Sequence, residues 1–207
     1  MTAHVSDEAP RRSARDRLLA SADELFYDEG VHTVGIDRVI EHAGVAKASL
    51  YRLFGSKEDL VAAYLAARHE RNLAELRAAA GRFENPREGV LAVFDTQAKW
   101  LRRRAYRGCA FARASAEPSA GAQVQAATDA YRAAIQALFT ELTVRAGVPD
   151  PQGLAVQLHA LYHGADIVVA SSRRSKLIAA VRSAAETLLA AAWRDEPETV
   201  HFHGPHG

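Results

Sequence analysis

Five side chains able to donate hydrogen bonds to phosphate lie close together in the chain: Lys47, Ser49, Tyr51, Arg52 and Lys57. Lysine and arginine can also reach the acceptor atoms of guanine, whereas serine and tyrosine hydroxyls suit phosphate oxygens. Each of the five could equally be an ordinary surface residue. Their chemistry therefore depends on the element that presents them.

The composition favours helices throughout the 207 residues, because alanine, leucine, arginine and glutamate dominate and alternating strand patterns are absent. With 48% hydrophobic and 25% charged residues, the chain is an ordinary globular protein. The net charge of +1 does not indicate which kind of molecule the protein binds. The single cysteine excludes an internal disulfide framework. The apolar spacing predicts nine helices, at residues 11–27, 34–42, 46–54, 57–80, 86–104, 109–117, 120–146, 152–172 and 175–193.

The residues between the second and third helices indicate a helix-turn-helix. Gly44, between Ala43 and Val45, permits the positive φ that a tight turn between crossed helices needs. Leu50 would point inward as the anchor of the third helix. The start of that helix could then enter the major groove of DNA. Ser56 is expected to cap the fourth helix.

The N-terminal part of the chain resembles the DNA-binding domain of the TetR family of repressors over residues 11–65. The resemblance rests on order, spacing and residue type together. It is carried by Arg17-Leu-Leu-Ala-Ser-Ala-Asp-Glu-Leu-Phe26, Glu29-Gly30, Ile36-Asp-Arg-Val-Ile40, Ala43-Gly-Val-Ala-Lys-Ala-Ser-Leu-Tyr-Arg-Leu-Phe54 and Ser56-Lys57-Glu58.

The resemblance implies an all-α fold with three parts. Residues 1–55 would be an N-terminal arm and a three-helix DNA-binding domain. Residues 56–194 would be a helical effector-binding and dimerisation domain, and residues 195–207 a disordered tail. The chain would be a homodimeric transcriptional regulator, most simply a repressor that a small molecule releases from a palindromic operator.

The DNA contacts follow from the matched positions. The expected contact residues are Thr33, Gly35, Lys47, Ala48, Ser49, Tyr51, Arg52 and Lys57. Two positions depart from the family pattern. Leu53 stands where the family often has histidine. The family commonly has serine or threonine near the start of the second helix; here Thr33 and Gly35 occupy that region, and Thr33 is the expected cap. Residues 11–60 hold eight basic and nine acidic side chains, so the positive charge must be arranged by face.

The C-terminal helices carry weaker signals. An effector pocket with an apolar wall and a few polar anchors could be lined by Phe94, Gln97, Trp100, Phe111, Tyr131, His159, Tyr162, His163 and Asp166. The same residues could simply form core. Small residues along 152–172 and 175–193 would let two copies of this helix pair form the dimer.

Three alternatives stay open. Cys109 could sense electrophiles or oxidants on the same scaffold, although a buried small hydrophobe is the simpler interpretation. An enzyme is not expected, because no catalytic motif or phosphate loop is found. A DNA-binding architectural protein without an effector is the third. No metal or cofactor is expected, no membrane span is supported, and a cytoplasmic protein is the prediction.

Overall fold

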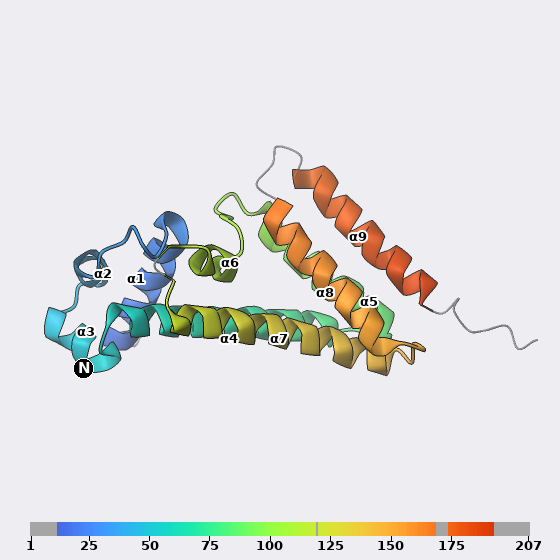
Figure 1. The fold of residues 1–207 in the computed structure, drawn as a ribbon, viewed down its shortest axis with the longest axis horizontal. Coiled ribbons are helices and arrows are strands. Elements are labelled where there is room, and N and C mark those ends of the chain that lie inside the picture. Colours follow the sequence, from blue (N-terminus) through green and yellow to red (C-terminus); the bar gives the residue numbers. More distant parts are fainter. Residues whose placement is uncertain (1–11, 119, 169–173, 193–207) are drawn as a thin grey trace, which may run out of the picture. The chain divides into compact units, whose positions relative to one another are not determined.

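The chain folds into α-helices over the residues that the computed structural model describes, which are 12–118, 120–168 and 174–192 (Figure 1). Nine helices and no strand lie in these ranges: α1 (Ala14–Glu29), α2 (Ile36–Ala43), α3 (Lys47–Phe54), α4 (Lys57–Ala80), α5 (Pro86–Arg102), α6 (Ala110–Ser115), α7 (Ala122–Arg145), α8 (Pro151–Val168) and α9 (Arg174–Ala191). The all-helical prediction is confirmed, with helix ends displaced by at most a few residues. The expected tail lies outside the described residues.

The chain divides into two compact units. The first contains the described parts of Met1–Asn72 together with Arg107–Arg132, and the second contains Leu73–Tyr106 and the described parts of Ala133–Gly207. Helices α4 and α7 therefore contribute residues to both units. The boundary expected near residue 55 stays a prediction.

The first unit begins with a helix fixed by its own sequence. Ser13 caps α1, since its hydroxyl accepts a hydrogen bond from the Asp16 amide at 3.1 Å and donates one to the Asp16 carboxylate at 2.7 Å. Ser56 caps α4 in the same way through Asp59, as the sequence predicted. The hydrogen bond from Ser56 holds the pKa of the Asp59 carboxyl below its usual value.

The core of the first unit forms where helices α1 to α4 turn their apolar faces inward. Leu18 and Phe26 of α1 are buried, and so are Leu50 of α3 and Leu60 and Tyr64 of α4. The Phe26 and Tyr64 rings meet edge to face, with centroids 5.7 Å apart. This shared core fixes the three short helices as one body.

The second unit is a helical bundle with an aromatic centre. Phe94 of α5, Phe139 of α7 and Tyr162 of α8 are buried against one another, with ring centroids 5.6 to 6.3 Å apart. Helix α9 packs along both α5 and α8 (Figure 1). None of the helices in the described ranges has both the length and the apolar character needed to cross a membrane.

Candidate nucleic-acid interface

The turn between α2 and α3 is a tight one centred on a left-handed residue. Gly44 has φ 62° and ψ 43°, and its amide donates to the Glu41 carbonyl at 3.0 Å. The Val45 amide donates to the Ile40 carbonyl at 3.3 Å. Arg17 of α1 donates to the Gly44 carbonyl at 3.1 Å. The angle between α2 and α3 is thus fixed both locally and from α1, and the glycine requirement predicted from the sequence is confirmed.

Helix α3 is anchored along one face and open along the other. Leu50 has no exposed surface, whereas the Tyr51 side chain is 45% exposed. Arg15 of α1 lies over the ring of Phe54, 5.6 Å from its centroid, and closes the far end of α3. The helix therefore presents its polar face outward from a rigid base.

None of the eight expected DNA contacts is buried. We call these eight residues the reading surface. Thr33, Gly35, Lys47, Ala48, Tyr51 and Arg52 are exposed, and Ser49 and Lys57 are half-buried. They come from the loop before α2, from α3 and from the first residue of α4. All eight belong to the first compact unit.

Lys47 is already engaged by a neighbouring helix. Its ammonium contacts Asp37 of α2, with Nζ and Oδ1 2.7 Å apart. This hydrogen bond raises the pKa of Lys47, so the amine stays protonated. Sequence reasoning missed Asp37 because the two residues lie in different helices, and no periodicity joins them.

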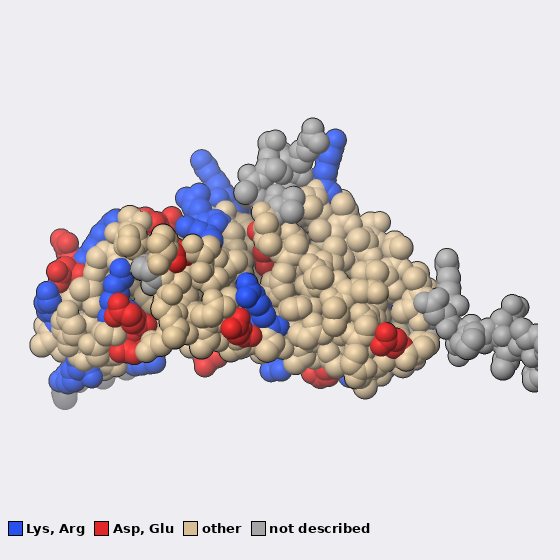
Figure 2. Space-filling view, in the orientation of Figure 1, with Lys and Arg blue, Asp and Glu red and all other residues tan. Residues whose placement is uncertain are grey.

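Other cations of the helix-turn-helix differ in how far they are neutralised. Arg38 of α2 pairs with Glu29 at the end of α1, with Nη2 and Oε1 2.7 Å apart. Arg52 and Lys57 form no ion pair with any residue in the described ranges. Figure 2 shows the resulting surface, on which blue and red side chains alternate over the N-terminal helices. Some cations of this region are paired with carboxylates and others are not, so a near-neutral region still presents individual positive side chains.

One expectation about the second helix is wrong. Thr33 does not cap α2; the N-cap residue is Gly35, and no side-chain hydrogen bond caps this helix. The helix starts at Ile36, so Thr33 stands two residues before the N-cap position from which a side chain can reach the first helical amides. The first amides of this helix therefore have no side-chain cap.

Part of the expected effector pocket forms a polar cluster in the second unit. Gln97 donates to the Tyr162 carbonyl at 2.7 Å and to the Asp166 carboxylate at 3.2 Å. Tyr106 donates to the same Asp166 oxygen at 2.8 Å, and His163 lies 3.9 Å from the other. Burial raises the pKa of Asp166 to about 6, although both hydrogen bonds act in the opposite direction.

The remaining expected pocket residues lie in different surroundings. His159 and His163 meet edge to face, with ring centroids 4.6 Å apart, and Phe94 contacts Tyr162 in the same unit. Trp100 is half-buried on α5. Phe111 and Tyr131 belong to the first unit, where their rings stack 4.0 Å apart. The effector pocket as a whole stays a prediction.

Cys109 is the half-buried residue that precedes α6. Its neighbours are tied to α1, since Tyr27 donates to the Gly108 carbonyl and accepts from the Arg107 amide, both at 3.0 Å. A sensing role for the cysteine stays a prediction. Across the part of the chain that the structure describes, no three side chains of histidine, cysteine, aspartate or glutamate gather as a metal site would require.

Comparison with known proteins gives the same result as the geometry. The family model of bacterial regulatory proteins of the tetR family matches residues 18–64. The solved structure of SCO4454, a TetR-family transcriptional regulator from Streptomyces coelicolor, is 34% identical with a TM-score of 0.81, and the match covers 87% of this chain and 96% of that one. The reduced form of Escherichia coli NemR is 25% identical with a TM-score of 0.73, covering 86% and 98%.

A curated relative matches over the N-terminal region. The transcriptional activator FasR of Mycolicibacterium smegmatis is 40% identical over 91 residues, which are 42% of this chain and 41% of that protein. The matches to the first curated relatives thus span less than half of their length.

Helix α3 is anchored on the core and follows a turn fixed by Gly44, which is the arrangement of a helix-turn-helix. The all-helical fold is shared with transcriptional regulators. Together these features define a DNA-binding transcriptional regulator. The chain belongs to the TetR family.

Proposed function

We propose that two copies of this chain form a repressor that binds a near-palindromic operator and releases it when a small molecule binds the C-terminal helices. Each copy inserts the N-terminal half of α3 into a major groove. The two half-sites lie about one helical turn, roughly 34–36 Å, apart. The observation that carries this proposal is the exposed face of α3 on a base fixed by Leu50 and the Gly44 turn.

The residues of the reading surface take different roles. Tyr51 and Lys57 bind phosphates, because an exposed hydroxyl and an ammonium without an ion-pair partner among the described residues suit that contact. Lys47 and Ser49, in the first turn of α3, are placed to approach base edges. Gly35 supports a backbone contact through the uncapped start of α2, and Thr33 stands in the loop before it. Ala48 offers its methyl group to an apolar base edge.

Dimerisation through α8 and α9 is supported by exposed apolar side chains on α8. Val156 and Ile167 of α8 are 57% and 73% exposed, unusual values for large apolar side chains. Figure 2 shows few charged side chains over these helices on the visible face. Burial of such a face against its copy would form a four-helix bundle.

A response to a small molecule is supported by the polar cluster around Asp166. Buried polar groups next to aromatic rings are common where proteins bind small molecules with defined orientation. Gln97, Tyr106 and His163 give this cluster both donors and acceptors. An effector that rearranges these contacts needs a coupling of only about 1–3 kcal/mol to change operator occupancy.

The DNA contacts can be tested with two substitutions. An operator recovered from random DNA by selection is titrated by fluorescence anisotropy, beside an unrelated duplex of equal length. Tyr51→Ala should weaken both duplexes about equally, whereas Lys47→Ala should reduce the preference for the operator. Gln125→Ala, on the exposed part of α7, is the control. Unchanged binding of both duplexes by both variants would refute the proposed contact surface.

The oligomeric state is tested separately by sedimentation. We expect a dimer for the wild-type chain and for Tyr51→Ala. Ile167→Glu should shift the equilibrium toward monomer, because two copies of the new charge would be buried opposite each other. A monomer at all concentrations in the wild-type chain would refute the proposed dimer.

A further inference from the structure

A half-open pocket lies in the first compact unit, beside the start of α4. Its volume is about 440 Å³, within the range of small-molecule sites. Residues that line it come from the loop after α1, the first turns of α4 and the first turn of α7. It is separate from the polar cluster around Asp166, which belongs to the second unit.

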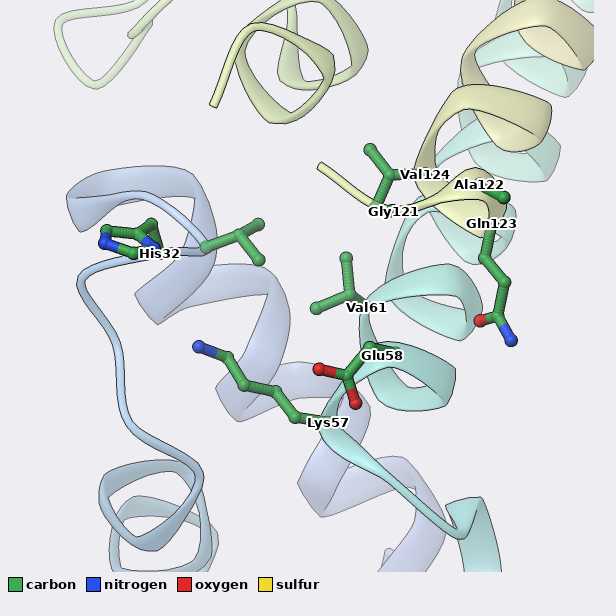
Figure 3. A pocket seen from close by; sticks show the side chains of 9 residues that line it. His32, Lys57, Glu58, Val61, Gly121, Ala122, Gln123 and Val124 are labelled. Carbon is green, nitrogen blue, oxygen red and sulfur yellow. The ribbon is translucent and has the colours of Figure 1, made fainter. Parts of the chain in front are cut away.

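The inner wall of this pocket is apolar. Val61 and Val124 are buried at the edge of the core and turn their methyl groups toward the space, as Figure 3 shows. Val31 adds a third branched side chain from the loop. A compact apolar group of a ligand would lose water-exposed surface against all three.

The loop that forms one wall is held in place. The Glu117 carboxylate accepts hydrogen bonds from the Val31 amide at 2.8 Å and from the His32 amide at 2.5 Å. Two charge-assisted bonds to successive amides fix the backbone on which Val31 stands. The pocket is thus bounded by fixed elements.

The rim of the pocket carries the cation Lys57, which has no ion-pair partner among the residues that the structure describes. The Lys57 side chain extends along the rim toward the loop that carries His32 (Figure 3). Its ammonium forms no ion pair or hydrogen bond with the residues that the structure describes. By contrast, the amide of Gln123 is committed, since it donates to Asp59 at 3.1 Å.

The two charged side chains of opposite sign that line the pocket differ in exposure, since Lys57 is half-buried and Glu58 is exposed. The first turn of α7 lines the pocket, and the positive end of its dipole adds to the charge of Lys57. Glu58 lies on the same rim and opposes an anion, but it is exposed and therefore screened by solvent. The apolar wall and the ammonium of Lys57 together favour a ligand with an apolar body and an anionic group.

We infer that this pocket binds a small carboxylate with a compact apolar body, whose carboxylate pairs with Lys57 and whose body packs on Val31, Val61 and Val124. A bound carboxylate would also remove Lys57 from the phosphate contact. That regulatory consequence rests on the proposed function, whereas the binding site itself does not. The site would act on the DNA-binding unit directly.

Binding is tested with three probes that share one apolar body and differ in head group: cyclohexanecarboxylate, cyclohexylmethanol and cyclohexylmethylamine. Dissociation constants are measured on the full chain by ligand-observed NMR titration. We expect the carboxylate to bind best, and Lys57→Gln to weaken it about tenfold, as loss of a charged hydrogen bond predicts. Lys57→Gln should leave the alcohol unchanged. Lys176→Gln, an exposed lysine of α9, is the matched control.

A second variant tests the pocket without changing charge. Ala122→Trp adds bulk at an exposed pocket residue, so the fold should be kept while the carboxylate is excluded. The proposal is overturned if the amine binds best, if the carboxylate does not bind, or if its affinity is the same in Lys57→Gln and Ala122→Trp as in the wild-type chain.

The regulatory consequence has its own measurement. Cyclohexanecarboxylate at saturation should lower operator affinity of the wild-type chain as far as Lys57→Gln does, with no further effect on that variant. If the carboxylate binds as expected and operator affinity does not change, the site stands and the phosphate contact of Lys57 is refuted. The two proposals can therefore fail separately.

Discussion

Asp166 should make the stability of the protein depend on pH in a window set by its burial. The carboxyl group is buried and has a pKa of about 6, against an ordinary value of 3.8. Because the folded pKa is raised, the folded chain binds the proton more tightly than the unfolded chain. The contribution to stability is fully present below about pH 4 and is lost as pH rises through 6.

The size of this loss follows from the two pKa values. Their difference corresponds to roughly 3 kcal/mol of unfolding free energy. Asp166→Asn removes the charge and keeps an oxygen that can accept from Gln97 and Tyr106. Relative to the wild-type chain, the unfolding free energy of the variant should therefore rise by about 2 kcal/mol between pH 4 and pH 7.

Urea unfolding followed by circular dichroism at several pH values measures this difference. Subtraction of the wild-type curve cancels every group that titrates alike in both chains. Since His163 lies 3.9 Å away, the comparison is repeated in a His163→Gln background. Asp129→Asn, which removes an exposed carboxylate from the other compact unit, is the control. A difference for Asp166→Asn that changes by less than about 1 kcal/mol in both backgrounds would refute the role assigned to burial.

Three further substitutions test the DNA-binding unit. Gly44→Ala should lower the unfolding free energy by about 1–2 kcal/mol in urea titration, because φ is 62° there, while the added methyl group would meet only the end of the Arg17 side chain at an ordinary 3.7 Å. Gly35→Ala should change it little, and equal effects would contradict the turn argument. Glu117→Gln should cost about 1–2 kcal/mol by the same measurement, since an amide oxygen replaces a charged acceptor of two backbone bonds, and an unchanged midpoint would count against that contact. Asp37→Asn should strengthen binding to unrelated DNA and steepen its salt dependence, because Lys47 loses its carboxylate partner; anisotropy titrations at several salt concentrations would contradict this by showing no change.

Local signals in the sequence were sufficient for the helices and the turn. Caps such as Ser56 and the left-handed glycine at 44 act within a few residues, so their types and spacing determine their structure. The inward position of Leu50 followed equally from helical periodicity. The outward position of Tyr51 on α3 followed from the same periodicity.

Contacts between distant residues could not be predicted in this way. The pair of Lys47 with Asp37 joins two helices, and the bonds of Glu117 to Val31 and His32 join residues more than eighty positions apart. The false cap at Thr33 arose because the start of α2 was placed two residues too early. The spacing of residues within one helix does not indicate which backbone amide a carboxylate from a distant part of the sequence will bind.

The pair between Lys47 and Asp37 has a consequence for how the protein finds its site. On random DNA, Lys47 keeps its carboxylate partner and adds little to the affinity. The protein then dissociates quickly and binds the next stretch of duplex. At the operator, a base acceptor in the right place can replace Asp37 as its partner. The single acidic side chain of Asp37 would thus shorten the lifetime of complexes with random DNA and leave the lifetime of the operator complex unchanged.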